Sequence, residues 1–258
     1  MIKRSQASDP ARAGVRVDVL GVRISTMTMD GVVATIDEWI KAGAREYVCV
    51  TGVHGVMESR RDPALLMIHN ASGMTTADGM PMVWAGRRAG AWWMTRVYGP
   101  DLVLAVLERA AAEGWRSYFY GGAPGVAEEL ADRMSQRFPG LVVVGTVSPE
   151  YPPVPGADVE AINEAAPDLV WVGLSTPTQE RWMAAHREAL HAPVLVGVGA
   201  AFDIHAGRLA QAPRWVQRSG LEWAYRLARE PRRLARRYLR NNPAFVLSIM
   251  RHPPRLRP

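Results

Sequence analysis

A carboxylate at the end of a short apolar strand is the side chain in this sequence that best fits acid–base chemistry. Asp78 lies between Ala77 and Gly79, after a predicted strand at 73–76 and before a helix that begins at Pro81. An aspartate in this place can accept the proton of an attacking hydroxyl, as the base of a single-displacement transfer does. Asp-Gly is also an ordinary turn dipeptide, so the assignment depends on the residues around it.

Other polar or glycine residues directly follow predicted strands, where ligands of parallel α/β sheets bind. They are Thr51, Gly121, Gly122, Ser175, Thr176 and Gly199. Gly121 and Gly122 open a glycine turn before a helix, so free backbone N–H groups and the positive helix end would face an anion. We therefore predict a diphosphate near Gly121 and Gly122. The run Gly197-Val198-Gly199 resembles the start of a dinucleotide fingerprint, but Phe202 replaces its third glycine, which favours a tight turn.

The sequence offers arginines, not acidic pairs, for holding a diphosphate. An Asp-x-Asp pair, the usual carboxylate grip on a metal-bound sugar diphosphate, is missing from the 258 residues. His54, His186 and His205 have no partner at metal-ligand spacing, and we interpret them as surface or hydrogen-bonded histidines. Arg96 and the arginines of the C-terminal tail would then stabilise a leaving diphosphate. We expect no metal and no cofactor.

Short apolar strands alternate with helices over most of the chain. Thr28 is predicted to cap a helix that runs to Ala42, and Asp62-Pro63 opens another. The predicted strands are 46–51, 73–76, 116–120, 141–146, 168–174 and 194–198. Continuous apolar strands between helices indicate a parallel sheet that is covered on both faces. We therefore predict a Rossmann-like, doubly wound α/β fold with a mainly parallel sheet and an arginine-rich helical C-terminal appendage.

Three further elements are an extended segment at 15–24, a helix capped by Asp101 that ends at Gly114, and a helix at 179–190. Beyond Pro213 the strands are expected to cease, and 215–250 is expected to be helical with an interruption at Pro231. The predicted organisation is a flexible N-terminus at 1–14, a catalytic α/β domain at 15–212 and a basic helical, membrane-docking appendage at 213–258.

Positive charge is concentrated near the C-terminal end. Residues 222–258 hold ten arginines and two acids, whereas residues 1–221 hold 21 basic and 23 acidic residues. Trp223, Tyr238 and Phe245 lie between these arginines, a mixture typical of a helix at the surface of an anionic membrane. The alternatives are a solvated basic helix and a non-catalytic basic module that binds a membrane or nucleic acid. A nucleic-acid module would bind duplex DNA as well as it binds anionic vesicles. We expect the membrane surface as a partner and no nucleic acid.

The expected location is cytoplasmic, peripheral at the inner face of the cytoplasmic membrane. No stretch approaches the roughly 20 apolar residues that span a bilayer, and the basic start of the chain has no apolar run behind it. Cys49 is the only cysteine, which excludes an intramolecular disulfide and fits a reducing compartment. We expect at least one of Trp84, Trp92 and Trp93 to be exposed at an interface. Oligomerisation stays open.

Ordered sequence blocks between about Val17 and Phe245 resemble the WecG/TagA/CpsF family of glycosyltransferases. The blocks are Thr51, 77–79 with Trp84, 96–102 (RVYGPDL), 120–125 (YGGAPG), 177–182 (PTQERW), 197–199 (GVG), 202–203 (FD), 206–207 (AG), 212–213 (AP), 220–227 (GLEWAYRL) and 230–238 (EPRRLARRY). The resemblance implies an inverting transfer from a UDP-sugar to a polyprenyl-diphosphate-linked saccharide. Such enzymes build cell-surface polymers of the teichoic acid, enterobacterial common antigen, capsule or exopolysaccharide type.

The resemblance also implies roles for particular residues. Asp78 would be the base, with Thr51 beside it. Arg96, Gly121, Gly122, Gln179 and Gly199 are expected on the side of the donor and its diphosphate. The expected acceptor-diphosphate and membrane residues are Arg226, Arg233 and Arg236.

The sequence departs from the family pattern at three places: Val53 replaces a usual asparagine, Thr178 a usual lysine and Gln211 a common arginine. Donor contacts are therefore expected to differ, so the resemblance does not carry over the donor sugar. A nicotinamide-dependent oxidoreductase of the same fold class is the other enzymatic reading. It would need a complete glycine fingerprint after the first strand of the fold and a ribose-binding acid about 20 residues later, and the first strand here lacks that turn.

Overall fold

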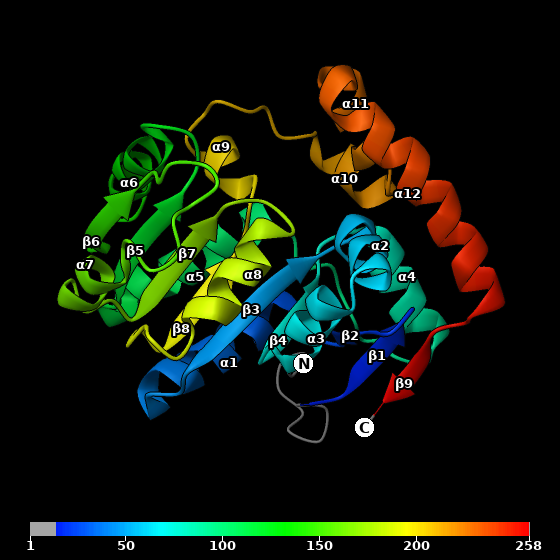
Figure 1. Cartoon of the computed structure of the whole chain (residues 1–258), viewed down its shortest axis with the longest axis horizontal. Coiled ribbons are helices and arrows are strands. Elements are labelled where there is room, and N and C mark those ends of the chain that lie inside the picture. The colour runs from blue at the N-terminus through cyan, green and yellow to red at the C-terminus, as the bar shows by residue number, and fades with distance from the viewer. Residues whose placement is uncertain (1–13, 258) are drawn as a thin grey trace, which may run out of the picture.

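The computed structural model describes residues 14–257 and has a six-stranded parallel sheet at its centre (Figure 1). The strands lie in the order β4-β3-β8-β7-β5-β6. Their bounds are β3 Glu46–Thr51, β4 Met74–Ala77, β5 Arg116–Gly121, β6 Val142–Val147, β7 Leu169–Gly173 and β8 Val194–Gly197. The predicted doubly wound α/β fold is confirmed. The predicted flexibility of 1–14 concerns residues that, apart from Gly14, lie outside this description.

Helices cover both faces of the sheet, which explains the continuous apolar strands. One face packs against α1 (Met29–Ala42), α5 (Gly99–Glu113), α6 (Val126–Arg137) and α9 (Ala201–His205). The other packs against α3 (Pro63–Ala71), α7 (Val159–Glu164) and α8 (Thr178–His186). Trp171 on β7 and Leu195 on β8, for example, are fully buried on opposite faces of the sheet.

Local sequence signals determine where several helices begin. The Thr28 side chain accepts the N–H of Gly31, and the left-handed Gly43 ends α1 as predicted. The Asp62 side chain likewise accepts two N–H groups at the start of α3. The predicted cap at Asp101 is wrong, because α5 begins two residues earlier and Asp101 lies within its first turn. Pro100 has a backbone angle suited to a helix and no N–H that needs a partner. The helix therefore begins before Asp101.

Other differences from the predicted elements lie in both halves of the chain. The predicted extended segment at 15–24 is a hairpin of β1 (Arg16–Val19) and β2 (Val22–Ser25). Its turn at Leu20-Gly21 is closed by the Asp18 side chain, which accepts the Gly21 N–H at 2.8 Å. Helix α4 (Met80–Arg88) was expected, whereas α2 (Val53–Arg61) and α9 were not. The predicted helix at 179–190 ends earlier, at His186.

The C-terminal segment consists of α10 (Arg214–Ser219), α11 (Glu222–Arg229), α12 (Pro231–Arg251) and β9 (Arg255–Arg257). The helical region is interrupted at Pro231, as predicted, and also at the left-handed Gly220. Phe245 of α12 packs in an apolar cluster with the β1–β2 hairpin, α2 and α4. The expectation that strands cease after Pro213 is wrong, because β9 pairs antiparallel with β1. Figure 1 shows this return of the chain, with the red β9 beside the blue β1.

Candidate functional site

A cleft of about 730 Å³ lies where the carboxyl ends of the strands meet the C-terminal helices. Four loops of the sheet contribute to it, those that follow β3, β4, β7 and β8. The polar and glycine residues that line it from the sheet side include Gly52, Asp78, Arg96, Tyr98, Ser175, Gln179 and Gly199. The C-terminal segment contributes Gln217, Glu222, Arg226, Arg233, Arg237 and Tyr238. This is the switch region of a doubly wound sheet, the usual place for a ligand.

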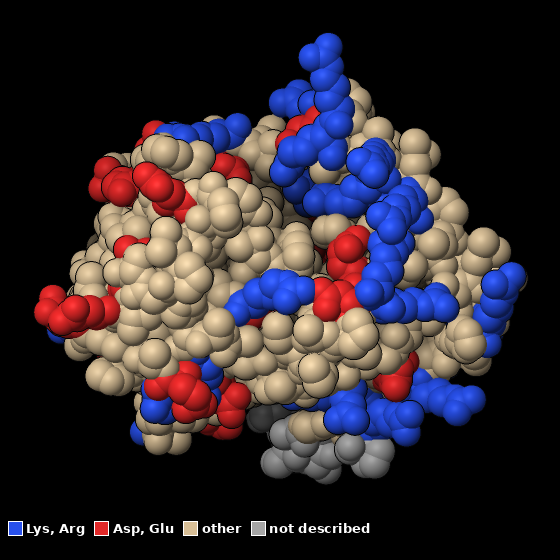
Figure 2. Space-filling view, viewed as in Figure 1, with Lys and Arg blue, Asp and Glu red and all other residues tan. Residues whose placement is uncertain are grey.

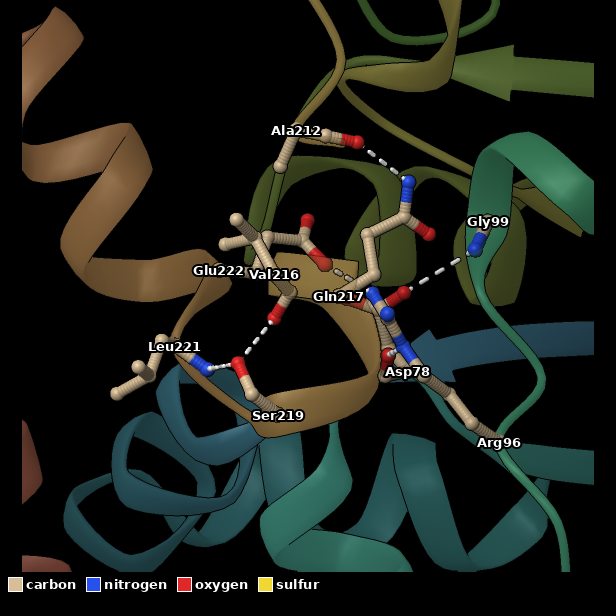
Figure 3. A network of polar contacts seen from close by, with 9 residues as sticks. All are labelled: Asp78, Arg96, Gly99, Ala212, Val216, Gln217, Ser219, Leu221 and Glu222. Carbon is tan, nitrogen blue, oxygen red and sulfur yellow. Dashed lines mark hydrogen bonds and ion pairs between the residues drawn. The ribbon is translucent and has the colours of Figure 1, made fainter. Parts of the chain in front are cut away.

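Asp78 is held in a fixed position at the end of β4. Its N–H donates to the Thr51 carbonyl at 3.0 Å, and its Oδ1 accepts the Gly99 N–H at 3.1 Å (Figure 3). Burial raises the pKa of Asp78, and the nearby carboxylate of Glu222 raises it further; Arg96, the Gly99 N–H and Arg226 act in the opposite direction. A carboxylate with a raised pKa is a stronger base, which suits proton abstraction.

Arg96 lies directly against the Asp78 backbone. Its Nε donates to the Asp78 carbonyl at 2.6 Å, and its Nη2 forms an ion pair with Glu222 of α11. The guanidinium lies over the Tyr98 ring at 3.9 Å from its centroid. The structure thus brings Arg96 and Asp78 together, with Arg96 engaged by three protein groups.

Thr51, at the end of β3, lies beside the end of the neighbouring strand β4, which Asp78 follows. Its hydroxyl, however, points into the protein. Its Oγ1 is 2.9 Å from Nε2 of the buried His69, whose Nδ1 is 3.0 Å from Ser59 Oγ. Burial lowers the pKa of His69, which favours the neutral ring. Within 14–257, Thr51 is not among the residues that line the cleft. Its link to the site is the backbone hydrogen bond to Asp78.

Gln179 and Gly199 meet at the sheet side of the cleft. Gln179 is 2% exposed, and its Nε2 donates to the neighbouring Glu180 at 3.1 Å. The buried Gln179 Oε1 has no hydrogen-bond partner among the described residues. A Cβ added at the left-handed Gly199 would lie 3.3 Å from this oxygen. A buried acceptor that lines a cleft and lacks a partner is suited to receive a ligand's donor group.

Gly121 and Gly122 do not line the cleft as far as the described residues show. A Cβ on Gly121, which has φ +131°, would lie 2.7 Å from the backbone of Gly173 on the neighbouring strand. The Gly122 N–H donates to the Gly173 carbonyl at 3.0 Å and is therefore occupied. These glycines permit close packing of β5 on β7, and the structure does not bring them to Asp78.

The arginines of α11 and α12 differ in whether they lie on a helical face that lines the cleft. Arg226 and Arg233 line the cleft, whereas Arg236 is exposed and does not appear in the lining within 14–257. Sequence reasoning did not select Arg237 as a site residue, although it lines the cleft. The signal was present, because positions 233, 237, 241, 245 and 249 of α12 all line the cleft at a spacing of four, which places them on one helical face.

The charged side chains and the tryptophans, which the sequence suggested for a surface that could meet a membrane, both have exposed members. Figure 2 shows Lys and Arg side chains gathered over α11 and α12, while several acidic side chains lie at the opposite end of that face. Trp84, in the cleft wall, is 51% exposed and Trp92 is 61% exposed. The expected exposure of a tryptophan is confirmed, and its place at an interface stays a prediction. No helix within 14–257 is both long and apolar enough to cross a bilayer.

The histidines singled out in the sequence make hydrogen bonds within the protein. Nδ1 of His54 is 3.1 Å from the Asn241 side chain, His186 accepts the Gly156 N–H at 3.0 Å, and His205 is 2.8 Å from the Pro100 carbonyl. Over the described part of the chain, no group of three or more His, Cys, Asp or Glu side chains is arranged to hold a metal ion.

Comparison with known proteins defines the class to which this fold and cleft belong. The model of the glycosyl transferase WecG/TagA/CpsF family matches residues 17–257. The chain belongs to this family and is a glycosyltransferase, which sets it apart from nicotinamide-dependent oxidoreductases of the same fold class.

Three curated relatives carry the name N-acetylglucosaminyldiphosphoundecaprenol N-acetyl-beta-D-mannosaminyltransferase. The protein of Bacillus spizizenii is 30% identical over 76% of this chain and 75% of its own length. That of Bacillus subtilis is 28% identical over 70% of each chain. That of Staphylococcus aureus is 26% identical over 91% of this chain and 92% of its own length.

Proposed function

We propose that this glycosyltransferase moves a sugar from a UDP-sugar to a polyprenyl-diphosphate-linked saccharide, with inversion and without a metal ion. The observation that carries the proposal is a partly buried carboxylate with a raised pKa, Asp78, in a cleft that three arginines of the C-terminal segment also line. The names of the relatives support a polyprenyl-diphosphate acceptor, because each names a diphosphoundecaprenol-linked sugar. The product would belong to a cell-surface polysaccharide.

The reaction needs one base and stabilisation for one leaving group. Asp78 takes the proton of the acceptor hydroxyl while the hydroxyl oxygen attacks the anomeric carbon, and the bond from that carbon to UDP breaks. Attack from the side opposite the leaving group inverts the anomeric centre. Gln179 and Gly199 contact the donor side, and Arg96 lies close to the reacting groups through the Asp78 backbone. Thr51 acts through its backbone carbonyl, which accepts the Asp78 N–H.

Three arginines of the C-terminal segment bring positive charge into the cleft. Arg226, Arg233 and Arg237 line the same cleft as Asp78, and guanidinium groups bind diphosphate oxygens with paired hydrogen bonds. We assign these arginines to the acceptor diphosphate. Arg96, which lies against the Asp78 backbone, is assigned to the leaving UDP diphosphate, because fixed positive charge where negative charge accumulates lowers the barrier of a transfer reaction.

The C-terminal segment, 213–258, is proposed to contact an anionic membrane from the cytoplasmic side. It carries its arginines together with exposed apolar residues of α12, namely Leu239, Val246, Leu247 and Met250. Apolar residues that line the cleft, Trp84, Phe245, Ile249 and Met250, offer a surface for the beginning of a lipid chain. Such a mixture fits a helix at the interface of an anionic bilayer.

The direct test is UDP release from a panel of UDP-sugars, with and without short-chain polyprenyl-diphosphate saccharides, in buffer that contains EDTA. We expect release that depends on the acceptor, occurs with one donor and is unchanged by EDTA. A product of retained anomeric configuration, or loss of release with EDTA that added Mg²⁺ restores, would contradict the mechanism. Silence across a broad panel would contradict the proposed substrates.

Two adjacent arginines of α12 allow a matched comparison. Arg237→Ala removes a guanidinium from the cleft, so we expect a rise of roughly tenfold or more in the KM for the acceptor. Arg236→Ala removes a neighbouring, exposed guanidinium, and acceptor KM should change less than about twofold in detergent solution. Equal effects of the two substitutions on acceptor kinetics would show that the helical face does not decide their roles.

A further inference from the structure

Glu222 is the acid of the C-terminal segment that forms an ion pair outside that segment. Residues 222–258 contain two acids, Glu222 and Glu230. Glu230 forms an ion pair with Arg233 of the same segment at 2.6 Å. Glu222, at the start of α11, instead forms an ion pair with Arg96 of the α/β part of the chain, and these two side chains are only 13% and 14% exposed. The segment therefore places a carboxylate inside a cleft that its arginines otherwise make positive.

The ion pair connects α11 to the base through a short series of contacts. Arg96 bonds Glu222 through Nη2 and the Asp78 carbonyl through Nε (Figure 3). The Gly99 N–H holds the Asp78 carboxylate from the other side at 3.1 Å. A displacement of Glu222 would thus release the guanidinium that fixes the backbone of the base.

Apolar packing holds helix α11 only lightly, chiefly through Trp223, whose ring lies edge-on to that of Tyr238 on α12. None of its eight residues, all of them described, is fully buried. A helix without a buried apolar residue depends on polar contacts for its position, because its apolar burial is small. Arg226 lies four residues after Glu222, one turn along the same helix, so its place in the cleft depends on the same contact.

The charged groups that face Asp78 are Arg96, Glu222 and Arg226, together with the phenol of Tyr98. Glu222 raises the pKa of Asp78, and Arg96 and Arg226 lower it. If α11 left the cleft, Glu222 and Arg226 would leave together, and Arg96 would lose its counter-ion beside the base. The position of α11 therefore determines both the geometry and the charge around Asp78.

We propose that Glu222 is a positioning residue whose ion pair with Arg96 holds helix α11 over the cleft and thereby places Asp78 and Arg226 for the reaction together. This inference rests on the proposed role of Asp78 as the base. Glu222 does not contact the reacting atoms. It couples the docking of the C-terminal segment to the assembly of the active site.

The test compares Glu222→Gln with Glu222→Asp and with Glu129→Gln. Glu129 pairs with Arg208 on the surface and does not line the cleft among the described residues, so Glu129→Gln removes one ion-paired carboxylate elsewhere. Substrates are the UDP-sugar and polyprenyl-diphosphate saccharide with which the unmodified protein releases UDP. The measurements are kcat, donor KM, the pH profile of kcat, and the rate of trypsin cleavage after Arg226 and Arg229.

For Glu222→Gln we expect a fall in kcat of roughly tenfold to a hundredfold, as small displacements of catalytic groups produce, with donor KM little changed. The acidic limb of the pH profile should move to lower pH, because the charge that raises the pKa of Asp78 is gone. Trypsin should cut α11 severalfold faster. Glu222→Asp, which keeps the charge, should restore the position of the acidic limb, and Glu129→Gln should behave as the unmodified protein.

The outcomes separate this inference from the proposed function. Unchanged kcat and cleavage in Glu222→Gln, with Asp78→Asn inactive, would overturn the role of Glu222 and leave the base in place. A fall in kcat without any change in the pH limb or in cleavage would also overturn it. Activity of Asp78→Asn would instead remove the base assignment. Cleavage of α11 by trypsin reports the position of the helix even if no substrate pair gives turnover.

Discussion

Replacing Asp78 with asparagine is expected to lower kcat by roughly a thousandfold, within the range that general bases contribute. An amide cannot accept the hydroxyl proton, yet its oxygen can still accept the Gly99 N–H that holds the carboxylate now. The fold should therefore persist, and the thermal unfolding midpoint should stay within a few degrees of the original. UDP release and thermal melts on the same preparations check both statements.

The pH profile provides a second measurement on the same residue. Because burial raises the pKa of Asp78, the acidic limb of kcat should lie above the usual range for an aspartate. Activity should be lost as the pH falls through that raised pKa, since only the ionised carboxylate accepts a proton. An acidic limb at or below the ordinary aspartate range, or near-full turnover in Asp78→Asn, would show that another group is the base.

Replacing Arg226 with alanine is expected to lower kcat/KM for the acceptor by roughly a hundredfold. Arg226 lines the cleft near Asp78, and its buried Nε has no hydrogen-bond partner among the described residues. A buried guanidinium nitrogen without a partner in the empty cleft is suited to bind an anionic ligand such as diphosphate. The measurement is the initial rate of UDP release over a range of acceptor concentrations.

Arg229→Ala is the matched control for this prediction. Arg229 lies on the same helix, is exposed and is absent from the cleft lining within 14–257. It should change acceptor kcat/KM less than about threefold in detergent solution, as exposed charges usually have small effects. Arg226→Lys should recover part of the activity, because it keeps the charge and loses the paired geometry. If alanine at 226 and at 229 had equal effects, total charge and not position would explain the role of Arg226.

Most of the α/β core could be predicted from the sequence because its signals are local. A buried parallel strand must be apolar along its length, as β7 and β8 are, and helix caps such as Thr28 act within a few residues. The β1–β2 hairpin and β9 depend on distant pairing. Arg255–Arg257 has two charged residues among three and becomes a strand only because β1 offers an unpaired edge.

The candidate site was predictable where position along a strand decides the geometry. Asp78 and Gly199 line the cleft because each follows the carboxyl end of a parallel strand, whereas Gln179, on α8, was expected only from the family resemblance. Gly121 and Gly122 also follow a strand, but they allow β5 to pack closely on β7. A sequence motif cannot distinguish glycines that pack against a neighbouring strand from glycines that bind a ligand. A count of charges could not single out Glu222, because its role depends on one distant partner in the fold, Arg96.

Strand β9 gives the helices above the cleft an anchor at each end. They follow Ala212 at one side and are tied to β1 by the pairing of Val17 with Leu256 at the other. A segment anchored twice explores less space when it lifts than one anchored once, so it loses less conformational entropy when it closes on a bound diphosphate. The local concentration of guanidinium groups over Asp78 therefore stays high even while the helices move. Under the proposed function, a polyprenyl-diphosphate acceptor would enter the cleft beneath a segment that is tied to the rest of the chain at both ends.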